Sequence, residues 1–190
     1  MSKLKHIIAI VGMPGSGKGT CTDYLANHLP VIHFGSIVVD EVKRRELEVN
    51  EANEKIVREE LRQQHGPAAV SILAQTKVDE MTAENEIVVI DGLYSWEEYK
   101  EYEQKYGDKL TVIAVFTPRK ARYQRLTNRE YRPLTIEQAQ RRDVAEIENL
   151  NKGGPIARAD YTLVNSDTPE HLISELTQLL NQELDIAIGK

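Results

Sequence analysis

A glycine-rich loop directly follows the first apolar run of the chain, and it constrains the fold more than any other feature. The run 7–11 reads Ile-Ile-Ala-Ile-Val, and the loop after it contains Gly12, Gly15, Ser16, Gly17, Lys18, Gly19 and Thr20. Glycines let the backbone turn tightly and bring its N–H groups against a phosphate, and a lysine at this offset reaches the β- and γ-phosphates. An ordinary strand-to-helix turn is the alternative, but it leaves the lysine unexplained. The segment therefore predicts a phosphate-binding loop (P-loop) and a chain that binds a nucleoside triphosphate.

The composition predicts one soluble domain and argues against several classes of protein. With 190 residues, 41% of them hydrophobic, the chain fits one domain with a full core, since domains usually have roughly 100–200 residues. The formal net charge of −6 argues against a general nucleic-acid or membrane-surface binder. No apolar run is long enough to span a bilayer, and the first one leads into the glycine loop rather than a cleavage site. We therefore expect a cytoplasmic protein that binds neither membranes nor nucleic acid.

Apolar runs alternate with helical patterns along the chain, as in a parallel sheet covered on both faces. The predicted class is α/β, with one doubly wound domain whose ligands bind at the carboxyl ends of the strands. Five strands are expected, at 7–11, 31–34, 87–90, 110–116 and 161–164. Helices are expected at 18–28, 37–46, 51–65, 68–81, 96–106, 118–129, 137–149 and 169–184. The single cysteine, Cys21, falls on the first helix, where we expect it to pack in the interior.

Two insertions interrupt this alternation. The stretch 35–81 is too long for one crossover helix, and the stretch 128–154 carries many arginines between two strands. We expect both to project over the P-loop.

Asp91 follows the buried run 87–90 and so lies at the carboxyl end of a strand that should neighbour the first. A magnesium ion, or its water ligands, needs an acidic partner at this place. A simple Asp-Gly turn is the alternative. Because the P-loop is already present, we favour a metal-linked role for Asp91, with the Thr20 hydroxyl contacting a phosphate or the metal shell.

Arginines crowd the region after the fourth strand of this acidic chain. They are Arg119, Arg122, Arg125, Arg129, Arg132, Arg141 and Arg142. Arg125 and Arg129 are four residues apart, so on a helix they would share one face and could neutralise a transferring phosphoryl group. Any one of these arginines taken singly more commonly forms an ion pair, here with Asp143, Glu146 or Glu148, than binds a phosphoryl group. We rank Arg125 and Arg129 first.

The sequence leaves the roles of two further groups of side chains undecided. Lys43, Arg44 and Arg45 could bind an acceptor phosphate or lie on an exposed helix of mixed charge. Tyr94 and Trp96 could stack on a base or close the cleft, although Trp96 could instead anchor the next helix.

These residues resemble the adenylate-kinase-like nucleoside monophosphate kinases over most of the chain. The P-loop is similar to theirs, including Gly19 before Thr20, and Asp91-Gly92 is similar to their acidic turn after the third strand. Arg125 with Arg129 matches the arginine pair that opens their lid, and Arg141 or Arg142, followed by Asp143, looks like the second lid arginine. The resemblance implies a P-loop NTPase fold in one kinase domain, 1–190. It also makes 35–81 the acceptor segment and 128–154 the lid segment.

The closest resemblance is to a poorly characterised group labelled adenylate-kinase-related or dephospho-CoA-kinase-like. It depends on 35–45, 61–70, 142–143, 156–161 and 164–165. The acceptor half departs from the monophosphate kinases, because Ser36, Val39 and Tyr94 stand near where those enzymes have an acid and two arginines. Dephospho-CoA kinases carry an aspartate at the end of the second strand, where this chain reads His33-Phe34-Gly35-Ser36.

These observations predict a kinase that transfers the γ-phosphoryl group of ATP, with Mg²⁺, to a nucleotide or nucleotide-like small molecule. The P-loop amides and Lys18 would hold the donor, and Asp91, Arg125, Arg129 and Arg142 would serve the transfer. The missing aspartate favours a monophosphate over a hydroxyl acceptor, which leaves dephospho-CoA as the second choice. A nucleotide-binding regulator or assembly factor with slow ATP turnover is the alternative of another class. GTP as donor stays open, and so do the acceptor and the oligomeric state.

Overall fold

The computed structural model describes residues 4–130 and 133–188. Its centre is a sheet of five parallel strands in the order β2-β3-β1-β4-β5. The strands are β1 (His6–Val11), β2 (Val31–His33), β3 (Ile87–Asp91), β4 (Leu110–Phe116) and β5 (Tyr161–Val164). The predicted class and strands are confirmed, and β3 lies beside β1 as expected for Asp91.

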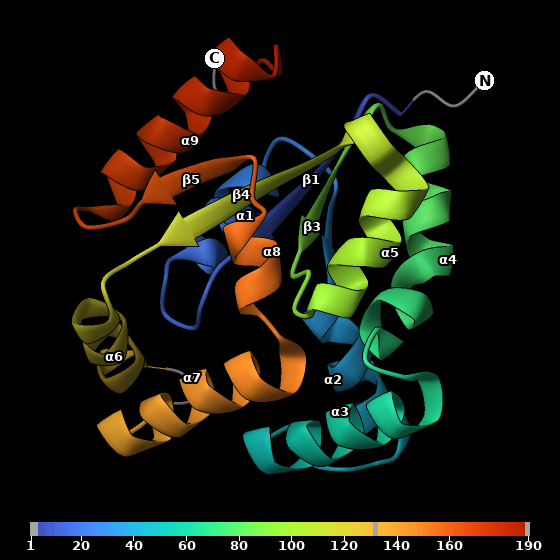
Figure 1. Cartoon of the computed structure of the whole chain (residues 1–190), viewed down its shortest axis with the longest axis vertical. Helices are drawn as coiled ribbons and strands as arrows, with labels where there is room; N and C mark the ends of the chain where they lie inside the picture. The colour runs from blue at the N-terminus through green and yellow to red at the C-terminus, as the bar shows by residue number, and fades with distance from the viewer. Residues whose placement is uncertain (1–3, 131–132, 189–190) are drawn as a thin grey trace.

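Helices connect the strands and cover both faces of the sheet (Figure 1). They are α1 (Lys18–Leu25), α2 (Phe34–Arg44), α3 (Glu51–His65), α4 (Ala69–Glu84), α5 (Trp96–Tyr106), α6 (Arg119–Asn128), α7 (Ile136–Leu150), α8 (Gly153–Ala157) and α9 (Pro169–Glu183), with one 3₁₀ turn, η1 (Gly107–Lys109). No helix in the described part of the chain is long and apolar enough to cross a membrane.

Strand β1 divides the core because its side chains alternate between the two faces of the sheet. Ile7 belongs to the cluster that contains Val38 of α2 and Val78 of α4, whereas Ile8 belongs to the cluster that contains Leu176 of α9. Cys21 is a fully buried member of the second cluster, which confirms the prediction that it packs. Apolar burial on both faces fixes β1, and the loop that follows it is therefore held at the carboxyl edge.

The element boundaries differ from the prediction at three places that matter for the site. Phe34 was expected to end a strand, but it begins α2, because its ring is buried against Tyr102 and the chain turns into a helix directly after His33. Helix α6 ends at Asn128, and Arg129 has an extended backbone. Arg125 and Arg129 therefore do not share a helix face, contrary to the prediction. The short helix α8 was not predicted.

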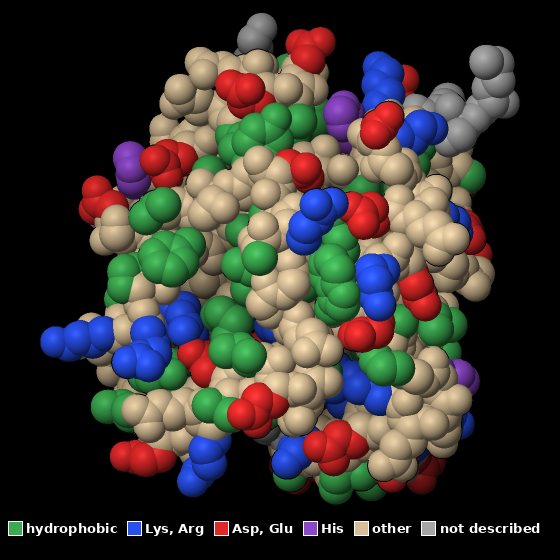
Figure 2. Space-filling view, in the orientation of Figure 1, with side chains coloured by type: hydrophobic (Ala, Val, Ile, Leu, Met, Phe, Trp, Pro, Cys, Tyr) green, Lys and Arg blue, Asp and Glu red, His purple; other side chains and the backbone are tan. Residues whose placement is uncertain are grey.

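Helices α2, α3 and α7 of the two insertions form the lower part of the view in Figure 1, whereas α4 runs up its right side beside α5. The acceptor segment contains α2, α3 and most of α4, and the lid segment contains α7 and the beginning of α8. Figure 2 shows Lys and Arg side chains gathered over α6, where Arg119 and Lys120 are exposed. Arg132 lies outside the described residues.

Candidate functional site

The glycine loop connects β1 to α1 in a conformation that other residues do not readily adopt. Gly12 and Gly17 have φ values of +148° and +105°, which favour glycine. A Cβ atom on Gly12 would lie 2.5 Å from the carbonyl oxygen of Val115, and one on Gly17 would lie 2.2 Å from Nδ2 of Asn165. A Cβ on Gly19, by contrast, would meet open space. The glycines at 12 and 17 thus fix the loop shape.

Lys18 folds back over this loop. Its Nζ donates hydrogen bonds to the carbonyl oxygens of Gly12 at 2.8 Å and Met13 at 3.2 Å. Desolvation and the nearby positive charge of Lys152 lower the pKa of Lys18 to about 7. An anion in the loop would oppose both effects, so this ammonium group is suited to bind phosphate oxygens.

Two side chains from the ends of β4 and β5 support the loop from behind. Thr117 Oγ1 and Asn165 Nδ2 each donate to the carbonyl oxygen of Ser16 at 2.8 Å. Arg125 contacts the same pair, donating to Thr117 Oγ1 at 3.2 Å and to the Asn165 carbonyl oxygen at 3.3 Å. The structure therefore places Arg125 against the residues that support the P-loop. Its role in phosphoryl transfer, like that of Arg129, stays a prediction.

A buried ion pair fastens the lid segment to the loop. Arg122 donates to both carboxylate oxygens of Asp143, at 3.0 and 2.5 Å, and to the carbonyl oxygen of Pro14 at 2.9 Å. Both side chains are 8% exposed. The hydroxyl of Tyr123 donates to Asp143 as well. Helices α6 and α7 and the P-loop thus share one hydrogen-bonded network.

Asp91 pairs with a residue that the sequence analysis did not assign to the site. Strands β2 and β3 bring His33 and Asp91 into register, and His33 Nδ1 lies 2.9 Å from Asp91 Oδ2. The His33 side chain is 46% exposed and that of Asp91 20%. The pair therefore faces the space beyond the carboxyl edge of the sheet. Only the tertiary pairing of these strands, 58 residues apart, reveals it.

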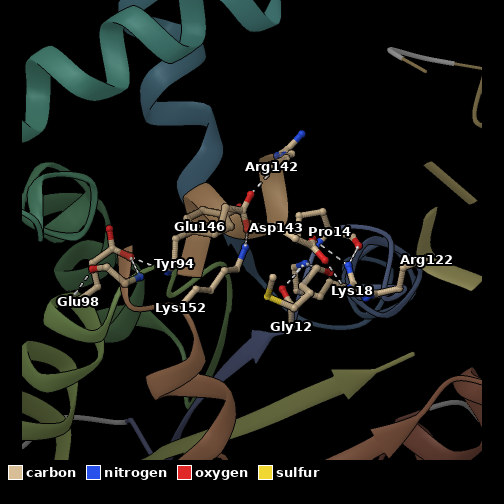
Figure 3. Close-up of polar contacts among 12 residues, drawn as sticks. Gly12, Pro14, Lys18, Tyr94, Glu98, Arg122, Arg142, Asp143, Glu146 and Lys152 are labelled. Carbon is tan, nitrogen blue, oxygen red and sulfur yellow. Dashed lines mark hydrogen bonds and ion pairs between the residues drawn. The ribbon is translucent and has the colours of Figure 1, made fainter. Parts of the chain in front are cut away.

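Arg142, Glu146 and Lys152 form a second polar group next to Lys18 (Figure 3). Arg142 Nε donates to Glu146 Oε1 at 3.0 Å, and Lys152 Nζ donates to Glu146 Oε2. The two cations hold the pKa of Glu146 low, at about 2, although burial opposes them. Lys152 is 3% exposed, and its Nζ lies 5.1 Å from the centre of the Tyr94 ring. Tyr94 therefore contacts a lysine of the lid segment.

Glu98 and Arg62 are two further charged side chains close to this polar group, since Arg62 and Lys152 both act on the pKa of Glu98. Glu98 Oε2 accepts hydrogen bonds from the backbone N–H groups of Tyr94 at 2.6 Å and Ser95 at 3.1 Å, within the capping box of α5. Within the described residues, the buried atoms Glu98 Oε1 and Arg62 Nε have no hydrogen-bond partner. Trp96 stacks on Tyr99 and would touch a Cβ on Gly154, so it anchors α5 against α8, as one of the two readings predicted.

Burial raises the pKa of Glu98 to about 7, against the effect of its two backbone hydrogen bonds. Between about pH 4.5 and 7 the folded protein retains a proton that the unfolded chain has released, so the free energy of unfolding should fall as pH rises through this window. Glu98→Gln should remove that part of the slope in urea denaturation at about pH 5, 6 and 7. The exposed Glu84→Gln is the control, and an unchanged slope in Glu98→Gln would contradict the assignment.

Sequence reasoning found the loop and Asp91 but missed or misplaced several neighbours. Lys152 lies directly before Gly153-Gly154-Pro155, which is a helix-break signal with no chemical meaning by itself. Glu98 was detectable as the third residue after Ser95 in a capping box. Arg44 and Arg45, considered for an acceptor phosphate, pair instead with Glu41 and Glu60. The interpretation as a charged helix surface therefore holds for these two arginines.

Oxygen donors near the loop fit a magnesium ion bound with substrate phosphates. The buried Ser16 Oγ has no hydrogen-bond partner among the described residues, and Thr20 and Asp91 add a hydroxyl and a carboxylate. No group of three or more His, Cys, Asp or Glu side chains in the described residues could hold a metal. Mg²⁺ is usually held by one or two carboxylates, water and phosphates rather than by an all-protein cage. This donor set therefore suits Mg²⁺ that arrives with a nucleotide.

Comparison with protein families and curated proteins gives consistent matches. A family model described as an AAA domain matches residues 8–149. A UPF0200 protein of Sulfurisphaera tokodaii is 38% identical over 187 residues, covering 97% of this chain and 100% of that protein. A UPF0200 protein of Thermococcus kodakarensis is 34% identical over 180 residues, covering 93% of this chain and 97% of that protein.

Solved structures share the fold at low sequence identity. A shikimate kinase of Bacteroides thetaiotaomicron has a TM-score of 0.60 at 15% identity, covering 93% of this chain and 98% of that one. A gluconokinase of Sinorhizobium meliloti has a TM-score of 0.55 at 13% identity, covering 90% of this chain and 89% of that one. The predicted P-loop NTPase fold is thereby confirmed, and it is kinase-like. The finer resemblance to adenylate kinases stays a prediction.

Proposed function

The chain belongs to the AAA-domain family that matches residues 8–149 and to the UPF0200 proteins, and from this premise we propose that it is an ATP-dependent small-molecule kinase. The acceptor is a nucleotide or a nucleotide-like compound. The observation that carries the proposal is the meeting of the P-loop and its Lys18 with a second polar group, Arg142, Glu146 and Lys152, from the lid segment. A donor site and a charged acceptor site next to it are what a kinase requires.

The proposed residues act mainly by positioning and by neutralising charge. The P-loop N–H groups and Lys18 bind the donor phosphates, which draws the ammonium group of Lys18 away from the carbonyl oxygens of Gly12 and Met13. An acceptor oxygen attacks the γ-phosphorus, the bond from that phosphorus to the bridging oxygen breaks, and ADP leaves with the bonding electrons. Arg142 and Lys152 lie close enough to Lys18 to affect its pKa, so their charges also reach the transferring group.

Thr20 and Asp91 are the residues that would hold Mg²⁺, directly or through water. The ion would offset the negative charge of the phosphates during transfer. Asp91 keeps its carboxylate in place through the hydrogen bond with His33, so this histidine is a positioning residue for the metal-linked group.

The test is ATP consumption with Mg²⁺, measured across the nucleoside monophosphates, dephospho-CoA, free nucleosides, shikimate and gluconate. The last two are included because solved structures with this fold bear those substrates in their names. A strong rise with one acceptor would support the kinase. Slow hydrolysis that no acceptor changes would instead favour a regulator or assembly factor.

A hydroxyl acceptor, as in dephospho-CoA kinase, is the second candidate, and the His33–Asp91 pair favours it. His33 ends β2, where dephospho-CoA kinases carry their aspartate, and its hydrogen bond to Asp91 leaves Nε2 free to accept a proton from a hydroxyl.

With a hydroxyl acceptor, His33→Gln should lower kcat by about 100-fold or more, because the proton acceptor is lost. With a phosphate acceptor, which needs little help from a base, kcat should fall far less, by no more than the loss of the hydrogen bond that positions Asp91. The assay is steady-state kinetics at several pH values on whichever acceptor the screen identifies, with the exposed His65→Gln as the control. A normal kcat for a hydroxyl acceptor would rule out His33 as the base.

A further inference from the structure

Two cations of the lid segment contact one buried carboxylate, and a cation of the acceptor segment lies near it. Arg62 comes from α3 in the acceptor segment, and Arg142 and Lys152 come from the lid segment. Arg142 and Lys152 both donate to Glu146, and the negative charge of Glu146 also acts on Arg62. Figure 3 shows Glu146 between Arg142 and Lys152, with Lys18 beyond them. We call Arg62, Arg142 and Lys152 the inner cation cluster.

The cluster has hydrogen-bonding capacity that the described residues do not use. Arg62 Nε is buried without a partner, and so is Oε1 of the neighbouring Glu98. A buried donor without a partner costs about 1–3 kcal/mol, so folded proteins keep few of them. The unused Nε donor of Arg62, buried among charged side chains, therefore indicates a place where a ligand supplies the missing hydrogen-bond acceptor.

The cluster also holds more positive than negative charge. Glu146 carries one full charge against the two cations that donate to it, Arg142 and Lys152. Glu98, the carboxyl group that acts most strongly on Arg62, has a raised pKa of about 7 and so offers only part of a second charge. Lys152 is almost completely buried, where a charge is costly unless an opposite charge compensates it. A ligand with two negative charges would balance this group better than Glu146 alone.

The position of the cluster relates it to phosphoryl transfer. Lys152 and Glu146 are the charged groups whose fields act most strongly on Lys18, so they lie next to the place where the donor phosphates bind. Arg44 and Arg45 of the acceptor segment already form ion pairs with Glu41 and Glu60, so the inner cation cluster is the better candidate for binding an acceptor phosphate.

We propose that Arg62, Arg142 and Lys152 bind the anionic group of the acceptor, a phosphate monoester, and that Glu146 occupies this place until the acceptor arrives. This inference rests on the proposed kinase function. Two guanidinium groups and an ammonium group suit the doubly charged phosphate of a nucleoside 5′-monophosphate. The contacts that the cluster makes with Glu146 are then exchanged for contacts with the acceptor. Glu146 is thus an internal competitor, and no new cation is needed to recognise the acceptor.

The experiment combines kinetics and binding in the full-length protein. Lys152→Met and Arg62→Gln should each raise KM for the monophosphate by about 10- to 100-fold, the effect of losing a charged hydrogen bond. Arg62→Gln should leave KM for ATP unchanged, whereas Lys152→Met removes a positive charge beside Lys18 and should change KM for ATP by a smaller factor than KM for the monophosphate. Lys77→Met, exposed on α4, is the matched control. Calorimetry with a non-hydrolysable ATP analogue present should show binding of the monophosphate and none of the nucleoside without phosphate.

Glu146→Gln gives an independent test if Lys152→Met does not fold. Removal of the internal competitor should make the monophosphate bind more tightly and raise the melting temperature by a larger amount than it does in the unaltered protein. Glu148→Gln on the exposed face of α7 should behave like the unaltered protein. Unchanged or weaker binding to Glu146→Gln would contradict displacement of Glu146.

The outcomes separate this inference from the kinase proposal. If no compound raises ATP consumption, the proposed function fails. If one does, but Lys152→Met and Arg62→Gln lower only kcat or change nothing, the kinase stands and the inner cation cluster is not the acceptor site. If the variants raise KM for a carboxylate-bearing hydroxy acid rather than a monophosphate, the phosphate assignment is wrong.

Discussion

Lys18→Ala should abolish phosphoryl transfer, with a loss on the order of 10³-fold in kcat/KM, the scale for removing a group that stabilises transition-state charge. The Lys18 ammonium group lies directly against the glycine loop, where it donates hydrogen bonds to two carbonyl oxygens of that loop. Lys152 and Arg142 also act on this region, but each donates a hydrogen bond to Glu146, whereas Lys18 donates to the loop itself.

The fold should survive this change, because the pKa of Lys18 is already lowered to about 7 and its charge contributes little to stability. The measurement is ATP consumption with the acceptor that the screen identifies, together with a thermal melt followed by circular dichroism. Lys77→Ala, exposed on α4, is the control. Activity within about tenfold of the unaltered protein would place the donor phosphates elsewhere.

Asp143→Ala should destabilise the protein by about 3–5 kcal/mol, because it leaves the buried Arg122 without its carboxylate. The loss extends to the P-loop, since the same guanidinium group donates to the carbonyl oxygen of Pro14. Urea denaturation at neutral pH measures the effect, with the exposed Asp108→Ala expected within about 0.5 kcal/mol of the unaltered protein. A similarly small change in Asp143→Ala would show that the ion pair does not fasten α7.

A double variant separates charge from shape at this ion pair. Arg122→Leu with Asp143→Leu should recover most of the stability, because an apolar pair of similar volume often replaces a buried ion pair at little cost. It should not recover activity, since the hydrogen bond from Arg122 to Pro14 is still missing. Recovery of both would mean that the pair serves stability alone.

Local patterns in the sequence were enough for the sheet and the P-loop. The strands follow from apolar runs, and the P-loop follows from consecutive residues whose backbone geometry requires glycine at 12 and 17. The errors fell where tertiary contacts override local preference. Phe34 leaves the strand because its ring is buried in the core, and α6 ends one residue before Arg129.

The acceptor half could not be predicted in the same way, because its residues meet only through the fold. Arg62 and Lys152 are 90 residues apart in the chain, and nothing near either one in the sequence distinguishes it from the cations that lie on the surface. His33 and Asp91 likewise become a pair only through the register of β2 and β3.

The sequence by itself thus determined a parallel α/β domain with a P-loop, since strand burial and tight turns depend on neighbouring residues. The tertiary structure decided which charged side chains face that loop. Three of the arginines that crowd the region after the fourth strand have different contacts. Arg122 forms a buried ion pair with Asp143, Arg125 supports the loop, and Arg142 joins Lys152 around Glu146. Charge acts through space over a few ångströms, and only the packing of α3, α7 and α8 against the sheet determines which charges come that close.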